Sequence, residues 1–382
     1  MTQRIILNLI SNEDDPKIVQ RCLRSIKPFL DAWVICDNGS TQEVRDEMLA
    51  CLGGIPGVLS CVPWVDFGTN KTQALELALQ YATDRFPGDE CYVFLIDCDE
   101  EFVSSDGYLL PNLNNGDMFG FRMITEGVVY PRPNLLNLKR KWWFDGPMHE
   151  KLSHDGDAPS LSVLEGAHIL VRQDGKRSKD LGKYWKDAET LRVAFEKDPR
   201  PRYKFYQAQA LRGARLYVDA LEAYCDYIAI ADDYNEKWYS LLQSGRIMDE
   251  CGNFPPEKVE HTFLCAYEMK PRRKEALASL AIHWRNRNKP NLALWASERA
   301  LGLQQDSNDI FFLETFWDFL LLEEVSRNAF AVGEYAKCAN ACRELLKRKG
   351  LSYEEIKRIE ANLKSVEALE LNPKLPASET NT

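Results

Sequence analysis

The 382-residue sequence predicts an α/β domain built on a mixed sheet, followed by an all-α region of helical repeats. In the first half, short runs rich in β-branched and aromatic residues alternate with amphipathic helical stretches, a pattern typical of parallel sheets flanked by helices. Beyond residue 180 the strand-like runs disappear, and helix-length segments recur about every 34 residues. We therefore expect a sheet domain over 1–180, a helical region over 181–370 and a disordered polar tail over 371–382.

Four strands are expected in the parallel part of the sheet, over 4–10, 33–38, 58–64 and 91–98. The helix between the first two begins at Asp15-Pro16, because Asp is a good N-cap and Pro suits the first helical position. A second helix is expected around Ala74 and Ala78, between the third and fourth strands. This alternation predicts parallel strands joined by helical crossovers.

A different pattern follows residue 102, with apolar runs separated by Gly, Asn, Asp and Pro. The runs cover 118–125, 128–136, 141–145 and 162–170. Turn-forming residues between short apolar runs favour antiparallel strands, so we expect these strands to extend the parallel sheet into a mixed one.

The helical region contains three helix–turn–helix segments, followed by a stretch that repeats the small-residue pattern of a second helix. They cover 202–228, 236–269, 273–303 and 331–350. Tyr206 and Tyr239 fall at equivalent places in the first two segments. The pattern resembles a tetratricopeptide array, with a generic α-solenoid as the alternative. Such arrays form concave surfaces, which favours peptide partners or self-association into a homo-oligomer through the repeats.

Composition narrows the class of protein. The net charge is −10 and no run rich in Lys or Arg occurs, so nucleic acid is a poor candidate partner. The eleven cysteines include no Cys-x-x-Cys pair and cannot all pair within one chain. No stretch reaches the ~18 apolar residues of a spanning helix, and the N-terminus does not resemble a signal peptide. We expect a cytoplasmic protein without a transmembrane segment.

The strongest chemical signal is the acidic end of the run "YVFLIDCDEEF", which contains Asp97, Asp99, Glu100 and Glu101. Carboxylates this close repel one another, and a cation would compensate them. Asp97 and Asp99 would point to the same side of an extended chain, as needed for a divalent ion that also binds a diphosphate. The alternative is an acidic turn that caps a helix.

A second signal is "VICDNGST", where Asp37 ends the second strand. Open α/β sheets bind ligands at the carboxyl ends of their strands. Asp37 could accept hydrogen bonds from a ribose or base there, and Asn38 and Ser40 could supply short polar contacts. The alternative is a simple Asp-Asn-Gly turn.

The order of "NLISNEDDPKIVQRCLRSIKPFLDAWVICDNGST", "DFGTNKTQALELA", "FLIDCDEEF" and "WWFDGPMHE" resembles glycosyltransferase family 2, the inverting enzymes of GT-A fold. Within it, the sequence is most similar to members with C-terminal tetratricopeptide repeats. The resemblance implies a sugar transfer with inversion from a nucleoside diphosphate-sugar, with a UDP-sugar as the first expectation. It also implies Mn²⁺ or Mg²⁺ on the leaving diphosphate. The concave surface of the repeats favours a protein or peptide acceptor, and a glycan, lipid-linked or at the cell surface, and a modified nucleobase are the alternatives.

The resemblance also implies roles for residues in these motifs. Asp37 would contact the nucleoside, and Asn70 and Lys71 would approach the donor. Asp97 and Asp99 would be the Asp-x-Asp metal motif, with Asp97 also contacting the donor.

The remaining roles concern the base and the last metal ligand. Glu150 is the candidate general base that takes the proton of the attacking acceptor, with Asp145 as the alternative. His168 is at the place where the family often supplies a last metal ligand. A histidine satisfied within its strand and a direct phosphate contact are the alternatives for His168, and His149 is the rival ligand.

Two further features have open interpretations. Trp142, Trp143 and Phe144 could form a platform for a sugar face or fill the core. The basic residues of "VRQDGKRSKD" could form a lid over the diphosphate or a solvated linker.

The competing hypothesis for the whole chain is a non-catalytic binding module with a helical-repeat scaffold for a partner protein. A nucleotidyltransferase is disfavoured, because "SNEDDP" follows the first strand where a glycine-rich basic loop would be needed.

Overall fold

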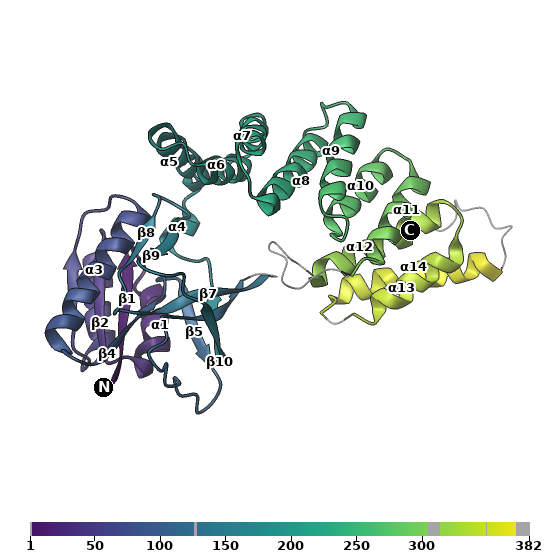
Figure 1. Ribbon diagram of the computed structural model, residues 1–382. Helices are drawn as coiled ribbons and strands as arrows, with labels where there is room; N and C mark the ends of the chain where they lie inside the picture. The colour runs from purple at the N-terminus through teal and green to yellow at the C-terminus, as the bar shows by residue number, and fades with distance from the viewer. Residues whose placement is uncertain (1, 126–127, 305–313, 349, 372–382) are drawn as a thin grey trace. The chain divides into compact units, whose positions relative to one another are not determined.

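The computed structural model describes residues 2–125, 128–304, 314–348 and 350–371 (Figure 1). Contacts between residues divide the chain into two compact units, residues 1–214 and 215–382. The tail predicted for 371–382 lies outside the described residues, apart from Leu371 at the end of the last helix. No helix within the described ranges is both long enough and apolar enough to cross a lipid bilayer.

Unit 1 contains an eight-stranded mixed sheet with the order β3-β2-β1-β4-β7-β6-β10-β5. Its parallel half confirms the four strands predicted there: β1 (Gln3–Ser11), β2 (Ala32–Asp37), β3 (Gly57–Cys61) and β4 (Glu90–Leu95). β1 lies in the middle of this half and pairs in parallel with both β2 and β4.

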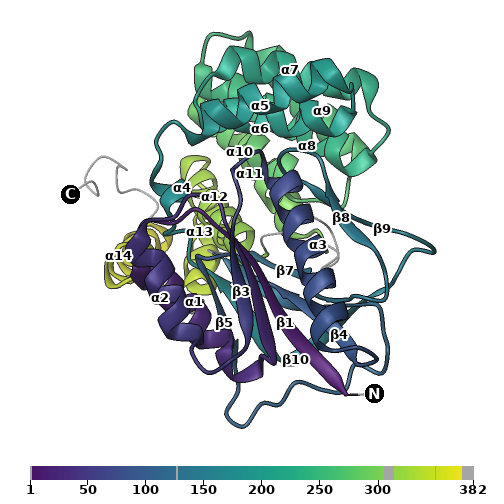
Figure 2. The same ribbon diagram turned by 90° about the vertical axis from the view of Figure 1, so that its left-hand side faces the viewer.

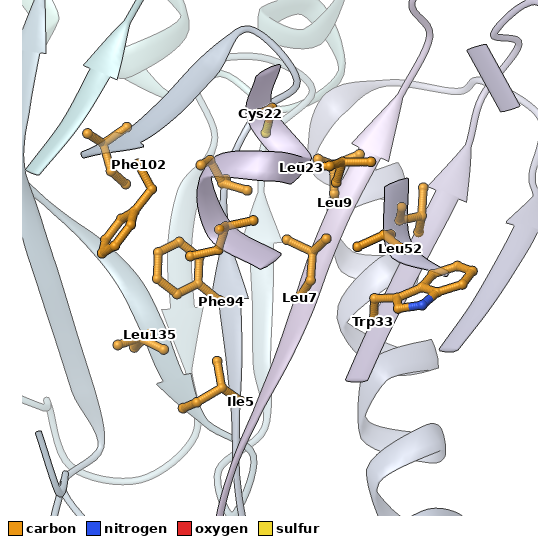
Figure 3. Close-up of a cluster of buried hydrophobic side chains, with 14 of the residues drawn as sticks. Ile5, Leu7, Leu9, Cys22, Leu23, Trp33, Leu52, Phe94, Phe102 and Leu135 are labelled. Carbon is orange, nitrogen blue, oxygen red and sulfur yellow. The ribbon is translucent and has the colours of Figure 1, made fainter. Parts of the chain in front are cut away.

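Helices cover both faces of the parallel strands: α1 (Pro16–Ile26), the 3₁₀ turn η1 (Lys27–Phe29), α2 (Gln42–Leu52) and α3 (Phe67–Arg85). As predicted, Asp15 caps α1 and accepts a hydrogen bond from Lys17 N. Because side chains alternate along a strand, Leu7 packs with α1 and α2 (Figure 3), whereas Ile6 packs with α3, the helix on the other face of the sheet (Figure 2). Burial on both faces explains why these strands are continuous apolar runs.

The other half of the sheet consists of β5 (Glu100–Ser104), β6 (Met118–Thr125), β7 (Val128–Asn137) and β10 (Leu161–Val171). The sheet is mixed as predicted: β7 runs antiparallel to β4 and β6, and β10 runs antiparallel to β5. The prediction that all the later strands are antiparallel additions is wrong for β10, which pairs in parallel with β6.

The run predicted over 141–145 does form a strand, but outside the main sheet. β8 (Trp142–Asp145) pairs only with β9 (Lys151–His154) in a separate two-stranded sheet. The reason is packing against α3, because buried Trp142 joins the hydrophobic cluster on that side. In addition, Thr72 Oγ1 donates to Phe144 O (3.3 Å) and accepts from Phe144 N (2.9 Å).

Three helices complete unit 1: α4 (Lys176–Lys179), α5 (Lys183–Lys197) and α6 (Pro201–Gly213). α5 and α6 belong to the predicted helical region, yet they pack in the unit that carries the sheet. Leu191 and Tyr203, on these helices, form a small core with Met148 from the segment after β8.

Unit 2 is entirely helical in its described residues. It contains α7 (Tyr217–Ile230), α8 (Tyr234–Cys251), α9 (Pro256–Met269), α10 (Glu275–Asn286), α11 (Pro290–Leu301), α12 (Glu314–Ala331), α13 (Tyr335–Leu346) and α14 (Tyr353–Leu371). Consecutive helices pack as neighbours over buried residues such as Trp238, Phe263 and Leu277. A C-terminal helical-repeat region is therefore confirmed. The interval between helix starts is 33 residues from Pro201 to Tyr234, close to the predicted 34, and 41 residues from Tyr234 to Glu275.

Candidate functional site

The candidate site lies where the order of the parallel strands reverses. From β1 the chain proceeds outwards to β2 and β3, then crosses back through α3 and adds β4 on the other side of β1. Open α/β sheets bind ligands at such a switch point, outside the carboxyl ends of the strands. The two ends meet, because Cys98 Sγ donates to Ile10 O at 3.5 Å. The residues after β1 and after β4 therefore share one location.

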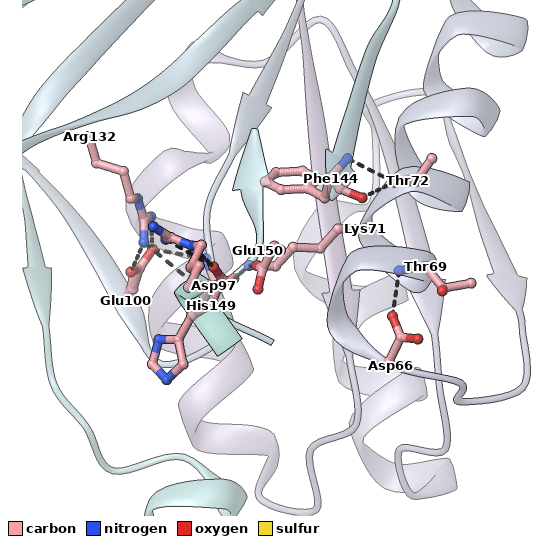
Figure 4. Close-up of polar contacts among 11 residues, drawn as sticks. Asp66, Thr69, Lys71, Thr72, Asp97, Glu100, Arg132, Phe144, His149 and Glu150 are labelled. Carbon is pink, nitrogen blue, oxygen red and sulfur yellow. Dashed lines mark hydrogen bonds and ion pairs between the residues drawn. The ribbon is translucent and has the colours of Figure 1, made fainter. Parts of the chain in front are cut away.

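A chain of five charged side chains, which we call the ionic centre, occupies this location (Figure 4). Lys71 Nζ lies 2.5 Å from Glu150 Oε1 and 3.8 Å from Asp97 Oδ1. Arg132 Nη1 lies 3.5 Å from Asp97 Oδ2, and the same guanidinium binds Glu100 through two bonds of 2.7 and 2.5 Å. The ionic centre contains three carboxylates and two basic groups, so one negative charge remains uncompensated.

The two basic groups decide the protonation of Asp97. Burial opposes its ionisation, but the charges of Lys71 and Arg132 outweigh that cost and lower the pKa of Asp97. Burial is the largest influence on Glu100 as well. Together with the charge of Asp97 it raises the pKa of Glu100, although the contact with Arg132 acts to lower it. Negative charge is thus concentrated on Asp97, which keeps 42% of its side chain exposed.

Asp99 faces a different neighbourhood from Asp97. β4 ends at Leu95, and Cys98-Asp99 form a turn, so the expectation that Asp97 and Asp99 share one side of an extended chain does not apply. A Cβ added at Gly175 would lie 3.2 Å from both Asp99 Oδ2 and Glu13 Oε2. Burial and the charges of Asp97, Asp174 and Glu13 raise the pKa of Asp99.

The segment 172–176 covers Asp99. Arg172 N donates to Asp99 O (3.2 Å), and Lys176 N donates to Glu13 Oε2 (2.8 Å). Arg21 on α1 holds the segment through two bonds to Asp174, of 2.8 and 2.7 Å. The basic stretch is therefore tied to the site by backbone and ionic contacts.

The two histidines considered as metal ligands do not join Asp97 and Asp99. His168 pairs with Val103, whereas Glu100 pairs with Val171, three residues further along β10. At ~3.3 Å per residue, this offset separates His168 from the Glu100 position by about 10 Å. The ring of His149 stacks on Tyr206, with centroids 4.1 Å apart.

Across the ranges that the structure describes, no group of three or more His, Cys, Asp or Glu side chains is placed to hold a metal ion. The cations that face the Asp97 carboxylate are the side chains of Lys71 and Arg132. In this arrangement the side chains do not form a divalent metal site, and the role of Mn²⁺ or Mg²⁺ stays a prediction.

The residues predicted to contact the nucleoside are engaged inside the protein. Both oxygens of Asp37 are used: Oδ1 accepts from Ser40 N and Oδ2 from Arg45 Nη1, each at 3.0 Å. Ser40 Oγ accepts from Glu13 N (3.0 Å), and Asn38 Nδ2 donates to Val62 O (3.0 Å). All three predicted contacts are buried, so they shape the turn after β2 in this structure.

Neighbouring residues on α3 have opposite roles. Asn70 is fully buried and holds the segment before α3, since its Oδ1 accepts from Val65 N (2.8 Å) and its Nδ2 donates to Pro63 O (3.0 Å). Lys71 instead points into the ionic centre (Figure 4). Of the two predicted donor contacts here, only Lys71 is brought to the site.

The two candidate bases are separated in the same way. Glu150 belongs to the ionic centre, whereas Asp145 binds Arg200 at 2.5 Å. Glu150 is delivered by the close docking of the turn after β8 onto α3: Phe67 N donates to Pro147 O (3.1 Å). A Cβ at Gly68 would lie only 2.1 Å from Gly146 O, so this contact requires glycine.

Sequence reasoning missed Arg132 and Glu13. Arg132 stands between two prolines and is the lone charge of β7, and a lone charge in such a strand is the signal that could have identified it. Glu13 lies directly after the first strand, at the switch point, but its neighbours Asp14 and Asp15 concealed it as part of a polar loop.

Comparisons with known proteins concern the helical architecture. No family model matches the chain, and no curated protein sequence matches it. A thermophilic TPR protein from Thermus thermophilus is 14% identical, with 48% of this chain and 92% of that chain covered and a TM-score of 0.35. PilF of Pseudomonas aeruginosa is 16% identical, with 51% of this chain and 86% of that chain covered and a TM-score of 0.37. A tetratricopeptide repeat protein from Parabacteroides merdae is 14% identical, with 50% of this chain and 88% of that chain covered and a TM-score of 0.29.

Similarity at this level does not identify a function. The helical-repeat organisation stands on the consecutive packed helices of unit 2 themselves.

Proposed function

We propose that unit 1 transfers a sugar from a nucleoside diphosphate-sugar, with a UDP-sugar as the first donor to test, to a protein, peptide or glycan acceptor. The observation that carries the proposal is the ionic centre, which lies at the switch point of a parallel α/β sheet. A cluster of charged groups at this position, with the Asp97 carboxylate exposed, is suited to a polar, charged ligand.

The chemistry assigns a task to each side chain. The ammonium of Lys71 and the guanidinium of Arg132 offer positive charge to the diphosphate of the donor. Glu150 accepts the proton of the attacking acceptor, and its bond to Lys71 positions the carboxylate until the phosphates compete for the ammonium. No step in this scheme passes through a metal, so dependence on Mn²⁺ or Mg²⁺ is a separate question for measurement.

Calorimetric titration of the full chain with UDP, GDP and CDP tests the proposal, with Mn²⁺ and again with EDTA. We expect one nucleotide to bind. We expect Asp99→Ala to weaken that binding about tenfold with Mn²⁺ and to leave it unchanged with EDTA, because Asp99 is a proposed metal ligand. Asp106→Ala is the matched control, because Asp106 is an exposed carboxylate in the turn after β5. Absence of binding by all three nucleotides in both conditions would reject the proposal.

The second candidate is a non-catalytic binding module with a helical-repeat scaffold. The observation in its favour is that Asp37, Ser40 and Asn70 already make internal hydrogen bonds through their side-chain oxygens, as Asn38 does through its Nδ2. This candidate predicts a folded chain that binds none of the nucleotides and self-associates through its repeats. Sedimentation of the full chain over a range of concentrations measures that association, and a strictly monomeric chain that binds UDP would contradict the candidate.

A further inference from the structure

A cavity of about 870 Å³ lies between α3 and the β8–β9 hairpin of unit 1. Its volume is within the range of sites that take small-molecule ligands. The polar residues that matter for its chemistry are Asp66, Gln73 and Glu76 from α3 and its cap, and Lys141 and Asp155 from the hairpin; the aromatic one is Trp143. None of the five side chains of the ionic centre lines it.

The charge of the residues that line the cavity excludes the nucleoside diphosphate-sugar as its ligand. Three carboxylates face one ammonium, so the cavity repels a nucleoside diphosphate. Asp66 Oδ1 accepts from Thr69 N (2.7 Å) and Asp155 Oδ1 from Lys141 N (3.1 Å), which orients these carboxylates without removing their charge. The carboxylates and the amide of Gln73 are acceptors and donors for the hydroxyl groups of a polar ligand.

Trp143 narrows the class of ligand further. Neighbouring side chains on a strand point to opposite faces, and Trp142 is the one taken into the core, at 4% exposure. Trp143 is only partly buried and lines the cavity. An indole offers an apolar face to the C–H groups of a sugar ring, while carboxylate and amide groups accept and donate hydrogen bonds to its hydroxyls.

Phe144 lies between the cavity and the ionic centre. Its backbone N and O bond to Thr72 of the lining, whereas its ring, on the face of β8 opposite Trp143, has its centroid 5.4 Å from Lys71 Nζ, the group that contacts Glu150. We propose that the cavity between α3 and the β8–β9 hairpin binds a neutral saccharide. We further assign that saccharide as the acceptor, an assignment that rests on the proposed function.

Saturation-transfer NMR on the full chain tests the site, with the methyl glycosides of glucose, galactose, mannose and N-acetylglucosamine as probes. The expected result is transfer to the ring C–H protons of at least one glycoside, reduced about tenfold in Trp143→Ala. The matched control is Trp185→Ala, because Trp185 is an exposed tryptophan of α5 outside the lining. Glu76→Gln, at an exposed position of the lining, serves as the second variant if Trp143→Ala fails to fold.

Absence of transfer from all four glycosides would overturn the inference, as would equal losses in the Trp143 and Trp185 variants. Binding of tetralysine in preference to every glycoside would overturn it too, because the site would then select positive charge. The nucleotide titration is an independent readout. Glycoside binding without nucleotide binding supports the saccharide site and rejects its acceptor role together with the proposed function.

Discussion

Two strands of the same sheet end in carboxylates that differ in their surroundings. Asp37, at the end of β2, is 2% exposed, and each of its oxygens has a hydrogen-bond donor. Asp97, two residues beyond β4, is 42% exposed and faces Lys71 and Arg132 at 3.8 and 3.5 Å. Both residues follow buried parallel strands, so position at a strand end does not by itself separate a structural carboxylate from a functional one.

The element that follows each strand explains the difference. After β2 the chain enters α2, and Arg45 from the first turns of that helix reaches back to Asp37. After β4 the chain enters β5 instead, and the cations that face the Asp97 carboxylate come from α3 and β7. Residues distant in sequence surround it, and they leave it accessible. We infer that Asp37 contributes mainly to stability and Asp97 mainly to ligand binding.

The largest effect is expected from Asp37→Ala. Removing this carboxylate leaves buried Ser40 N without its acceptor and removes one of the bonds of Arg45, which should lower the free energy of unfolding by about 2 kcal/mol. Urea unfolding measures this change in stability. The control is Asp46→Ala, because Asp46 is an exposed carboxylate beside Arg45 on α2. An unchanged stability combined with weaker nucleotide binding would break the comparison and return Asp37 to the donor site.

A smaller effect, on binding, is expected from Lys71→Met. The variant removes the ammonium between Asp97 and Glu150, so the dissociation constant of the nucleotide should rise about tenfold. Lys71→Arg keeps the charge and should retain most of the affinity in the same calorimetric titration. Equal affinities for the Met variant and the unsubstituted chain would remove Lys71 from the site.

The smallest effect is expected from Asp174→Asn, which weakens the attachment of segment 172–176 to α1. Because Asp174 is 43% exposed, the pair with Arg21 should contribute at most about 1 kcal/mol to stability. The hydrogen bond from Arg21 lowers the pKa of Asp174 below its ordinary value of 3.8. This contribution is therefore complete at neutral pH and is lost as the pH falls through the lowered pKa.

Urea unfolding of both chains at pH 7 and near pH 3 sharpens this prediction. The difference between the chains should be present at pH 7 and shrink in acid. A difference that grows in acid would show that Asp174 acts through another partner.

The strands that could be predicted from the sequence are those whose patterns are local. β1, β2 and β4 are apolar runs because both faces of the sheet are covered, and β6 was found over the same residues, 118–125. β5 was missed because it begins with Glu100-Glu101, and acidic residues are depleted in strands. Its buried Glu100 is compensated by Arg132, 32 residues away, and no local pattern reveals that pairing.

The candidate site could likewise be predicted only in part from the sequence. Lys71, Asp97 and Glu150 were identified and lie together. Asn70 was grouped with Lys71, yet it bonds to the segment before its own helix. A residue type shows which hydrogen bonds a side chain can make, but only the fold shows which of them are already made inside the protein.

The link between α1 and segment 172–176 has a consequence for the order of folding. Arg21 and Asp174 are 153 residues apart in the chain, and Glu13 and Lys176 are 163 apart. Contacts of such long sequence separation close large loops and form slowly. The cover over Asp99 can therefore form only after the ribosome has released almost all of unit 1, so a nascent chain that stops at β10 has the sheet without the closed site.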